Sequence, residues 1–337
     1  MNKVAILILT KDRPDFIIRQ LEYYKTLKSP HPVYILDSSN KENASKIKDY
    51  IRESNVSYVW VEPGQQPFNK LLVKCHEKYV CYSGDDDYQI PDSLTECAEF
   101  LDKNPGFVSC SGQAVSIRLK GNGAYGPIER VSDYNRQEVL DNLPEDRFLN
   151  LMNNYCVHLF NVTRIETYRK MWNYLPDFRD DMVEIYPVSK LVIDGKVKVI
   201  DNLQFIRQIH GMNGGALGTK FQWLANHFKD SYAEVKNRLP IPEKIIELGF
   251  ENYIRNMLNS RYSNVPVGKP KKQQLRILLT RKFPILKRIY RRHIKPTFSW
   301  EVTQEDSKYH KTFKTIEDSL WGLMKPTFDS ARMDIKD

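Results

Sequence analysis

The chain has 337 residues, of which 41% are hydrophobic and 12% aromatic, as in a folded protein with a sizeable core. No run approaches the ~20 apolar residues that a membrane-spanning helix needs. The five cysteines include no C-x-x-C pair, which argues against a disulfide framework or a zinc site and for a reducing, cytoplasmic setting.

The net charge of +9 belongs to one segment of the chain. Residues 252–300 contain thirteen Lys or Arg and no Asp or Glu, which leaves 38 basic and 42 acidic residues elsewhere. A nucleic-acid enzyme more often spreads positive charge along its active cleft. We therefore expect no nucleic-acid partner.

Short apolar runs alternate with segments of helical periodicity through the first hundred residues. We expect strands at 4–10, 33–36, 57–61 and 79–82, and helices at 15–27, 44–53 and 68–78. Four strands that alternate with helices through short links predict an α/β fold with a mostly parallel, doubly wound sheet.

The pattern is less regular after the fourth strand. We expect helices at 91–103, 148–154 and 164–172, strands at 107–110 and 197–200, and a loop or hairpin at 119–136. A boundary near Gly215–Gly218 separates residues 1–215 from a mainly helical, basic C-terminal region at 216–337.

Polar clusters follow three of the predicted strands. They lie at residues 10–13, 37–39 and 85–87. Ligands of such sheets bind beyond the carboxyl ends of the strands, so we expect the three clusters to meet at one edge.

The acidic run Asp85, Asp86 and Asp87 directly follows a buried strand. Adjacent carboxylates repel one another, and a divalent cation that also binds phosphate oxygens would justify gathering them. The alternative is an acidic surface turn before the helix at Pro91.

These motifs resemble a known family. The sequences VAILILTKDR at 4–13, DSS at 37–39 and GDDD at 84–87 are similar to family 2 of the GT-A glycosyltransferases, especially a bacterial branch that acts in surface-polysaccharide assembly. The resemblance covers residues 1–215. It implies a GT-A catalytic domain with a nucleotide-binding part at 1–112 and an acceptor-binding part at 113–215.

The resemblance also implies an activity. Members transfer a sugar with inversion from a nucleotide-sugar donor, UDP-linked by default, to a hydroxyl of a glycan or lipid-linked glycan acceptor, with Mn²⁺ or Mg²⁺ as cofactor. Asp37 would accept a hydrogen bond from the base, and Asp87 would bind the metal directly, with Asp85 on the ribose or metal side. The donor-binding residues would be Thr10, Lys11, Arg13, Asp37, Ser39, Asp85 and Asp86.

Family members carry a second acidic pair that supplies the catalytic base, and Asp180 and Asp181 occupy that place. A carboxylate that removes the proton of an acceptor hydroxyl makes it a better nucleophile. Asp180 replaces the usual Glu, and we favour Asp181 as the base. The alternative is that the pair caps a helix that starts at Met182.

Three further side chains are candidates with ordinary alternatives. His210 follows a predicted strand where many GT-A enzymes place a metal ligand, but it also fits a structural histidine. Arg207 could hold the diphosphate, with the glycine-rich stretch at 211–218. Lys70 could reach the donor or lie on a solvated helix face.

The basic segment 269–296 interleaves apolar and cationic residues. It could lie on an anionic membrane surface, which would make the protein peripheral to the membrane. It could instead pack on the main domain with its charges in water, or bind nucleic acid, which we rank last.

Two rival functions use similar sequence features. A sugar nucleotidyltransferase would normally carry a glycine-rich loop after the first strand, and residues 10–14 contain no glycine. A non-catalytic sugar-nucleotide or polysaccharide-binding protein would not need both the GDDD motif and the downstream Asp pair.

Overall fold

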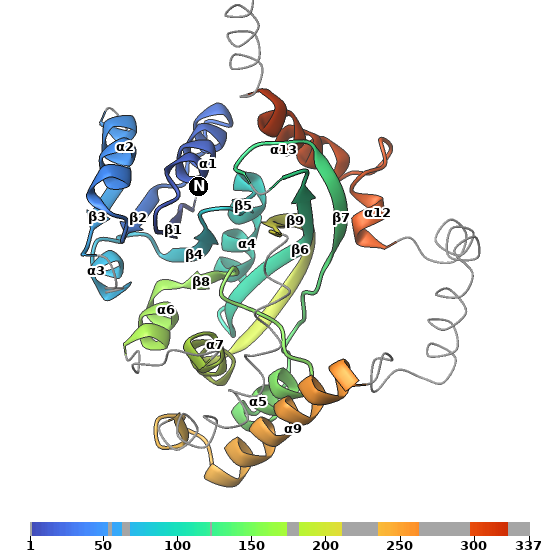
Figure 1. The fold of residues 1–337 in the computed structure, drawn as a ribbon. Coiled ribbons are helices and arrows are strands. Elements are labelled where there is room, and N and C mark those ends of the chain that lie inside the picture. The colour runs from blue at the N-terminus through green and yellow to red at the C-terminus, as the bar shows by residue number, and fades with distance from the viewer. Residues whose placement is uncertain are drawn as a thin grey trace, which may run out of the picture.

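The computed structural model describes residues 2–52, 56–62, 68–121, 123–173, 182–210, 235–262 and 297–322. Within these ranges a nine-stranded sheet runs in the order β3-β2-β1-β4-β8-β6-β9-β5, with β7 paired to β6 (Figure 1). The strands are β1 Val4–Thr10, β2 Val33–Asp37, β3 Ser57–Trp60, β4 Tyr79–Gly84, β5 Tyr88–Gln89, β6 Phe107–Leu119, β7 Ile128–Tyr134, β8 Val162–Arg164 and β9 Lys196–Gln208.

The sheet is mixed but mostly parallel, as predicted. Strands β3, β2, β1 and β4 are parallel neighbours, and β6 is parallel to β9. The short strand β8 runs antiparallel between β4 and β6 and so joins these two parallel groups. β5 and β7 are the other antiparallel additions.

Helices cover both faces of the sheet. They are α1 Pro14–Thr26, α2 Lys41–Ile51, α3 Phe68–Leu72, α4 Pro91–Lys103, α5 Pro144–Asn153, α6 Ile165–Trp172, α7 Met182–Asp194, α9 Glu243–Tyr262, α12 Phe298–Glu301 and α13 His310–Gly322. Pro occupies the first turn of α1, α4 and α5, where its fixed φ and missing N–H are tolerated.

The side chains of β1 alternate between two hydrophobic cores. Val4, Ile6 and Ile8 pack with residues of α1, α2, α4 and α13, whereas Ala5 and Leu7 pack with residues of α3, α5, α6, α7 and α9. All five side chains are fully buried. The C-terminal helices α9 and α13 therefore complete the cores on opposite faces of the sheet.

The strands on the far side of β8 are longer than the sequence pattern indicates. β6 and β9 each span 13 residues and pair with register shifts along their length. The predicted loop or hairpin at 119–136 is a hairpin, because β7 returns antiparallel along β6. Conversely, the helix predicted at 68–78 is shorter, because α3 ends at Leu72. The backbone N–H groups of Lys74 and Cys75 then donate to carbonyls three residues back, as in a turn.

No helix among the described residues is long and apolar enough to cross a membrane. All five cysteines are buried as free thiols. Asp180, Asp181, the glycine-rich stretch at 211–218 and the basic segment at 269–296 lie outside the described residues.

Candidate active site

The predicted polar clusters meet where β1, β2 and β4 end. Thr10 pairs with Asp37 across β1 and β2, and Leu9 pairs with Gly84 across β1 and β4. This register places Thr10 beside Asp85, and the Thr10 hydroxyl donates to Asp85 Oδ2 at 2.8 Å. The parallel sheet thus brings residues 75 positions apart into direct contact.

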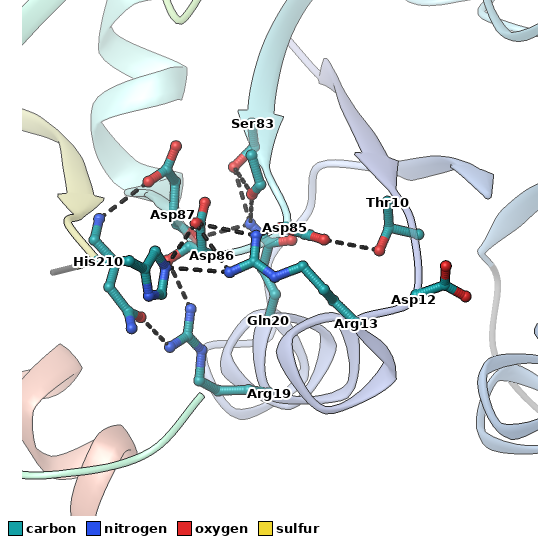
Figure 2. Close-up of polar contacts among 12 residues, drawn as sticks. Thr10, Asp12, Arg13, Arg19, Gln20, Ser83, Asp85, Asp86, Asp87 and His210 are labelled. Carbon is teal, nitrogen blue, oxygen red and sulfur yellow. Dashed lines mark hydrogen bonds and ion pairs between the residues drawn. The ribbon is translucent and has the colours of Figure 1, made fainter. Parts of the chain in front are cut away.

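Arg13, directly before α1, lies among the carboxylates (Figure 2). Its Nη1 is 2.6 Å from Asp85 Oδ1, and its Nη2 is 3.1 Å from Asp86 Oδ2. The guanidinium also stacks on the ring of Phe16, 3.9 Å from the centroid. Arg13 therefore neutralises part of the acidic run.

His210, which follows β9, contacts one of these two carboxylates, Asp86. Its Nε2 lies 2.8 Å from Asp86 Oδ2 and 3.1 Å from Nη2 of Arg13. We assign the proton to Nε2, because the carboxylate contact is the shorter of the two. His210 therefore becomes part of the site although it lies 124 positions from Asp86 along the chain.

The three carboxylates differ in environment. Burial raises the pKa of Asp85 to about 6, against the opposing effect of Arg13. Although burial opposes it, hydrogen bonding to His210 and the charge of Arg13 lower the pKa of Asp86. Burial and the neighbouring Asp86 raise the pKa of Asp87 well above its usual range, and Asp87 Oδ1 accepts the Gln208 N–H at 3.0 Å.

Two residues of α1 that sequence reasoning missed bind the backbone of residues 84–87, which we call the acidic loop (Figure 2). Arg19 is fully buried and donates to the carbonyls of Asp86 and Ala124 and to Oε1 of Gln208 at 2.5–2.7 Å. Gln20 donates to the carbonyls of Gly84 and Asp87. A usable signal existed for Gln20, which lies one turn from both Phe16 and Tyr24 on the apolar face of the predicted helix, whereas Arg19 lies outside that face.

Asp37 and Ser39 are held by their own network at the end of β2. Asp37 is fully buried, and it accepts hydrogen bonds from the Ser39 N–H at 2.8 Å and from the Tyr58 hydroxyl. The Ser39 hydroxyl accepts the N–H of Asp12, whose φ of 55° is left-handed. These bonds fix the loop after β1 against the loop after β2.

A cleft of about 240 Å³ opens between these loops. Its lining residues are Leu9, Thr10, Lys11, Arg13, Leu36, Ser38 and Asp85. Apolar side chains from two strands therefore form one part of its wall, and cationic and acidic side chains form the rest. This combination suits a ligand with both an aromatic and an anionic part.

The remaining predicted residues take other positions. Arg207 is exposed on β9, with its guanidinium 5.5 Å from the ring centroid of Tyr134. Lys70 is exposed on α3, which contacts β2 and α6, and among the described contacts it takes no part in the carboxylate network. Asp180 and Asp181 are not described, so their role stays a prediction.

In the described part of the chain, no group of three or more His, Cys, Asp or Glu side chains is arranged to hold a metal ion. The guanidinium of Arg13 instead lies against Asp85 and Asp86. The donor chemistry is nevertheless suitable, because carboxylate oxygens and an imidazole converge here, and both ligand types bind Mn²⁺.

No protein-family model matches the chain, and no characterised protein matches it in sequence. Its fold is similar to that of TarS from S. aureus. The structure of TarS 1–349 in complex with UDP-GlcNAc gives a TM-score of 0.55 at 14% identity, covering 81% of this chain and 77% of that chain. The complex of the same fragment with UDP gives 0.53 at 14% identity with the same coverage.

A longer TarS structure gives a TM-score of 0.51 at 13% identity and covers 78% of this chain but 44% of that chain, so the chain spans less than half of its length. The mannosyltransferase PcManGT from Pyrobaculum calidifontis, in complex with GDP-Man and Mn²⁺, gives 0.45 at 11% identity, with 94% and 84% covered. The chain therefore has a mixed α/β fold, with a curled and mostly parallel sheet, that is similar to the fold of TarS.

Proposed function

We propose that the chain is a metal-dependent, inverting glycosyltransferase of the GT-A type that uses a nucleotide-sugar donor. The observation that carries this proposal is the convergence of Thr10, Arg13, Asp85, Asp86 and His210 beside the cleft at the ends of β1, β2 and β4. Ligands of open α/β sheets bind at this edge. The TarS structures with the same fold contain UDP and UDP-GlcNAc, which supports a nucleotide-sugar donor.

The nucleoside would bind on the β1–β2 side of the cleft. Asp37, Ser39 and Thr10 are fixed there by backbone and side-chain hydrogen bonds, so their polar groups are preorganised. Lys11 and Arg13 line the same cleft and would contact the anionic diphosphate. Lys70 and Arg207 remain proposed donor contacts that this network does not include.

Asp85, Asp87 and His210 would hold Mn²⁺ or Mg²⁺, and Asp86 joins them because it is the carboxylate that contacts His210. When bound, the cation would neutralise charge on the departing diphosphate. Arg13 and a cation compete electrostatically for the same carboxylates, so donor and metal binding would redirect the guanidinium from Asp85 and Asp86 toward phosphate oxygens.

The acceptor would approach from the side formed by residues 113–215. We propose Asp181 as the base that removes the proton from the acceptor hydroxyl, with Asp180 beside it as the alternative. A glycan or lipid-linked glycan is the proposed acceptor, in surface-polysaccharide biosynthesis. The basic segment 269–296 would hold the protein on an anionic membrane surface, in the cytoplasm.

The test is a donor screen that measures release of nucleoside diphosphate from a panel of nucleotide sugars with Mn²⁺, Mg²⁺ or EDTA. The variants Asp87→Ala, Asp86→Ala and Asp181→Ala would be compared with Asp49→Ala, which removes an exposed carboxylate from α2. We expect metal-dependent release from one donor that is lost in the first three variants and kept in the fourth.

The other outcomes separate the rival functions. Donor binding without any release, with or without an acceptor glycan, would indicate a non-catalytic binding protein. Formation of a nucleotide sugar from a nucleoside triphosphate and a sugar phosphate would indicate a nucleotidyltransferase. Absence of all nucleotide binding would contradict the proposal.

A further inference from the structure

A second polar cluster shares no residue with the acidic loop, and we call it the Arg136 cluster. It comprises Tyr134, Arg136, His158 and Asn161. Arg136 Nη1 donates to the carbonyl of Val157 at 3.1 Å and to Asn161 Oδ1 at 3.2 Å. Its Nε and Nη2 atoms are buried and have no hydrogen-bond partner within the part of the chain that the structure describes, and the same holds for the Tyr134 hydroxyl and His158 Nε2.

The hydrogen bonds within the cluster fix which groups are donors. Asn161 Oδ1 accepts from Arg136, so the amide nitrogen of Asn161 faces His158 Nδ1 at 3.3 Å and donates to it. The neutral imidazole then carries its proton on Nε2. Burial and the charge of Arg136 lower the pKa of His158 to about 3, which keeps the ring neutral. The unpartnered His158 and Arg136 atoms are therefore all N–H donors.

Arg136 also lacks a counter-charge. Among the described residues no carboxylate forms an ion pair with it, and its guanidinium lies 5.4 Å from the ring centroid of Tyr134 and 5.2 Å from that of Phe205. Aromatic faces offset only part of the cost of burying a guanidinium. Burying a charged group whose N–H donors lack partners costs free energy, unless a hydrogen-bond acceptor binds to these donors.

A group of stacked aromatic rings connects the cluster to the acidic loop. Phe160 stacks on Phe205 with centroids 4.3 Å apart and on Tyr82 at 5.5 Å, and Tyr82 is three residues before Asp85. Arg207 is near both sites: its guanidinium lies 5.5 Å from the ring centroid of Tyr134, and, although partial desolvation opposes its charge, Tyr134 and Asp87 raise its pKa. Phe160 and Phe205 are buried, whereas Tyr82 and Tyr134 are partly exposed, and such aromatic faces beside hydrogen-bond donors suit a sugar ring that carries an anionic group.

We propose that the Arg136 cluster is an acceptor subsite that binds an anionic group of the acceptor glycan, a carboxylate or a phosphate, through Arg136 and His158. The inference rests on the proposed function in one respect, which is that the bound molecule is the acceptor. Oxyanions are the acceptors that a guanidinium binds most strongly, because both N–H groups of its edge bond to them at once.

The test measures binding of small probes by saturation-transfer NMR at constant ionic strength. The probes are glucuronate and glycerol phosphate, with glucose and glycerol as their neutral counterparts, and UDP binding is measured in the same samples. The variant Arg136→Met removes the donors and keeps the apolar stem. The matched control is Arg130→Met, which removes an exposed cation from β7, six residues before Arg136.

We expect one anionic probe to bind, with its Kd raised about tenfold or more by Arg136→Met and unchanged by Arg130→Met, while the neutral probes bind poorly. Whether glucuronate or glycerol phosphate binds distinguishes the carboxylate from the phosphate. His158→Phe, which removes one donor from the same cluster, should weaken the same probe. UDP affinity should stay constant in all three variants.

Two results would overturn the inference. One is equal anion binding by the wild type and Arg136→Met. The other is a lower unfolding midpoint of Arg136→Met, with no anion raising the midpoint of the wild type, which would mean that Arg136 only stabilises the fold. Loss of UDP binding in every protein, with Arg136-dependent anion binding kept, would count against the proposed function but not against the anion site.

Discussion

The ion pair between Arg13 and Asp85, with Nη1 and Oδ1 2.6 Å apart, joins the residue before α1 to the first carboxylate after β4. The same guanidinium reaches Asp86, so one cation lies against two of the three adjacent carboxylates. Asp85 is 7% exposed and Arg13 is 33% exposed, so the pair lies at the rim of the cleft rather than deep in the core. Arg13 is therefore positioned to exchange its carboxylate partners for others.

The first prediction concerns this exchange. Arg13→Gln removes a positive charge that competes with a divalent cation for Asp85 and Asp86. We expect Mn²⁺ to bind about fivefold to tenfold more tightly to the nucleotide-free variant than to the wild type, by isothermal titration calorimetry. Arg52→Gln, which removes an exposed cation beside Asp49, is the control. Equal Mn²⁺ affinity in Arg13→Gln and wild type would show that Arg13 and the cation do not compete.

The sequence predicts the half of the fold that carries this pair, for a clear physical reason. Strands β1 and β2 are short runs that are apolar up to their last residue, and α1 and α4 begin at prolines, so local pattern and local structure agree. Strands β6 and β9 were predicted at four residues each, whereas each spans 13. Their length depends on the pairing of β6 with β9 and with β7. Such long-range pairing leaves little trace in local periodicity.

The sequence likewise predicts only those parts of the candidate site that depend on local pattern. Thr10, Arg13, Asp37 and Asp85 follow buried strands, so the parallel-sheet rule alone places them together. The contact of His210 with Asp86 depends on where the end of β9 lies, which spacing along the chain does not determine. The unpartnered donors of Arg136 become visible only when every nearby acceptor is known.

The second prediction concerns Gly84. A Cβ atom at this position would lie 2.7 Å from Asp87 Oδ2 and 2.8 Å from Asp86 Oδ1, so Gly84→Ala must displace these carboxylates. We expect metal-dependent turnover of the donor to fall about tenfold to a hundredfold, because catalytic groups tolerate little misplacement. Gly106→Ala is the control, since its Cβ would meet nothing within 4 Å. Unchanged turnover in Gly84→Ala would show that Asp86 and Asp87 do not take part in the reaction.

The third prediction concerns the support beneath the acidic loop. Arg19→Met keeps the buried apolar stem but leaves the Asp86 carbonyl, the Ala124 carbonyl and Gln208 Oε1 without their donor. Each buried acceptor that loses its partner costs roughly 1–3 kcal/mol. Three such acceptors would cost about 3–9 kcal/mol, and removing the buried charge of Arg19 offsets part of this, so we expect the free energy of unfolding in urea to fall by about 2–5 kcal/mol, and the KM for the donor to rise. Arg19→Lys should recover part of the stability, and an unfolding free energy equal to that of the wild type would contradict the assigned support.

The last prediction concerns pH and His31, which lies far from the proposed chemistry. His31 is 4% exposed; its Nδ1 accepts the Val4 N–H at 3.0 Å, and its Nε2 donates to the carbonyl of Pro91 at 2.9 Å. A second proton would have to enter at Nδ1 and break the bond to β1. Burial accordingly lowers the pKa of His31 below its ordinary value of 6.5.

Because the folded pKa of His31 is depressed, the unfolded chain binds more protons below pH 6.5. The contribution of His31 to stability is therefore complete above pH 6.5 and is lost as the pH falls toward the folded pKa, by up to about 1.4 kcal/mol per pH unit. We expect urea unfolding between pH 5 and 8 to show a steeper acid loss in the wild type than in His31→Gln, which has no proton to gain. The exposed His76 offers the matched variant His76→Gln, which should follow the wild type. Parallel curves for the wild type and His31→Gln would mean that His31 is protonated equally easily in the folded and unfolded chains.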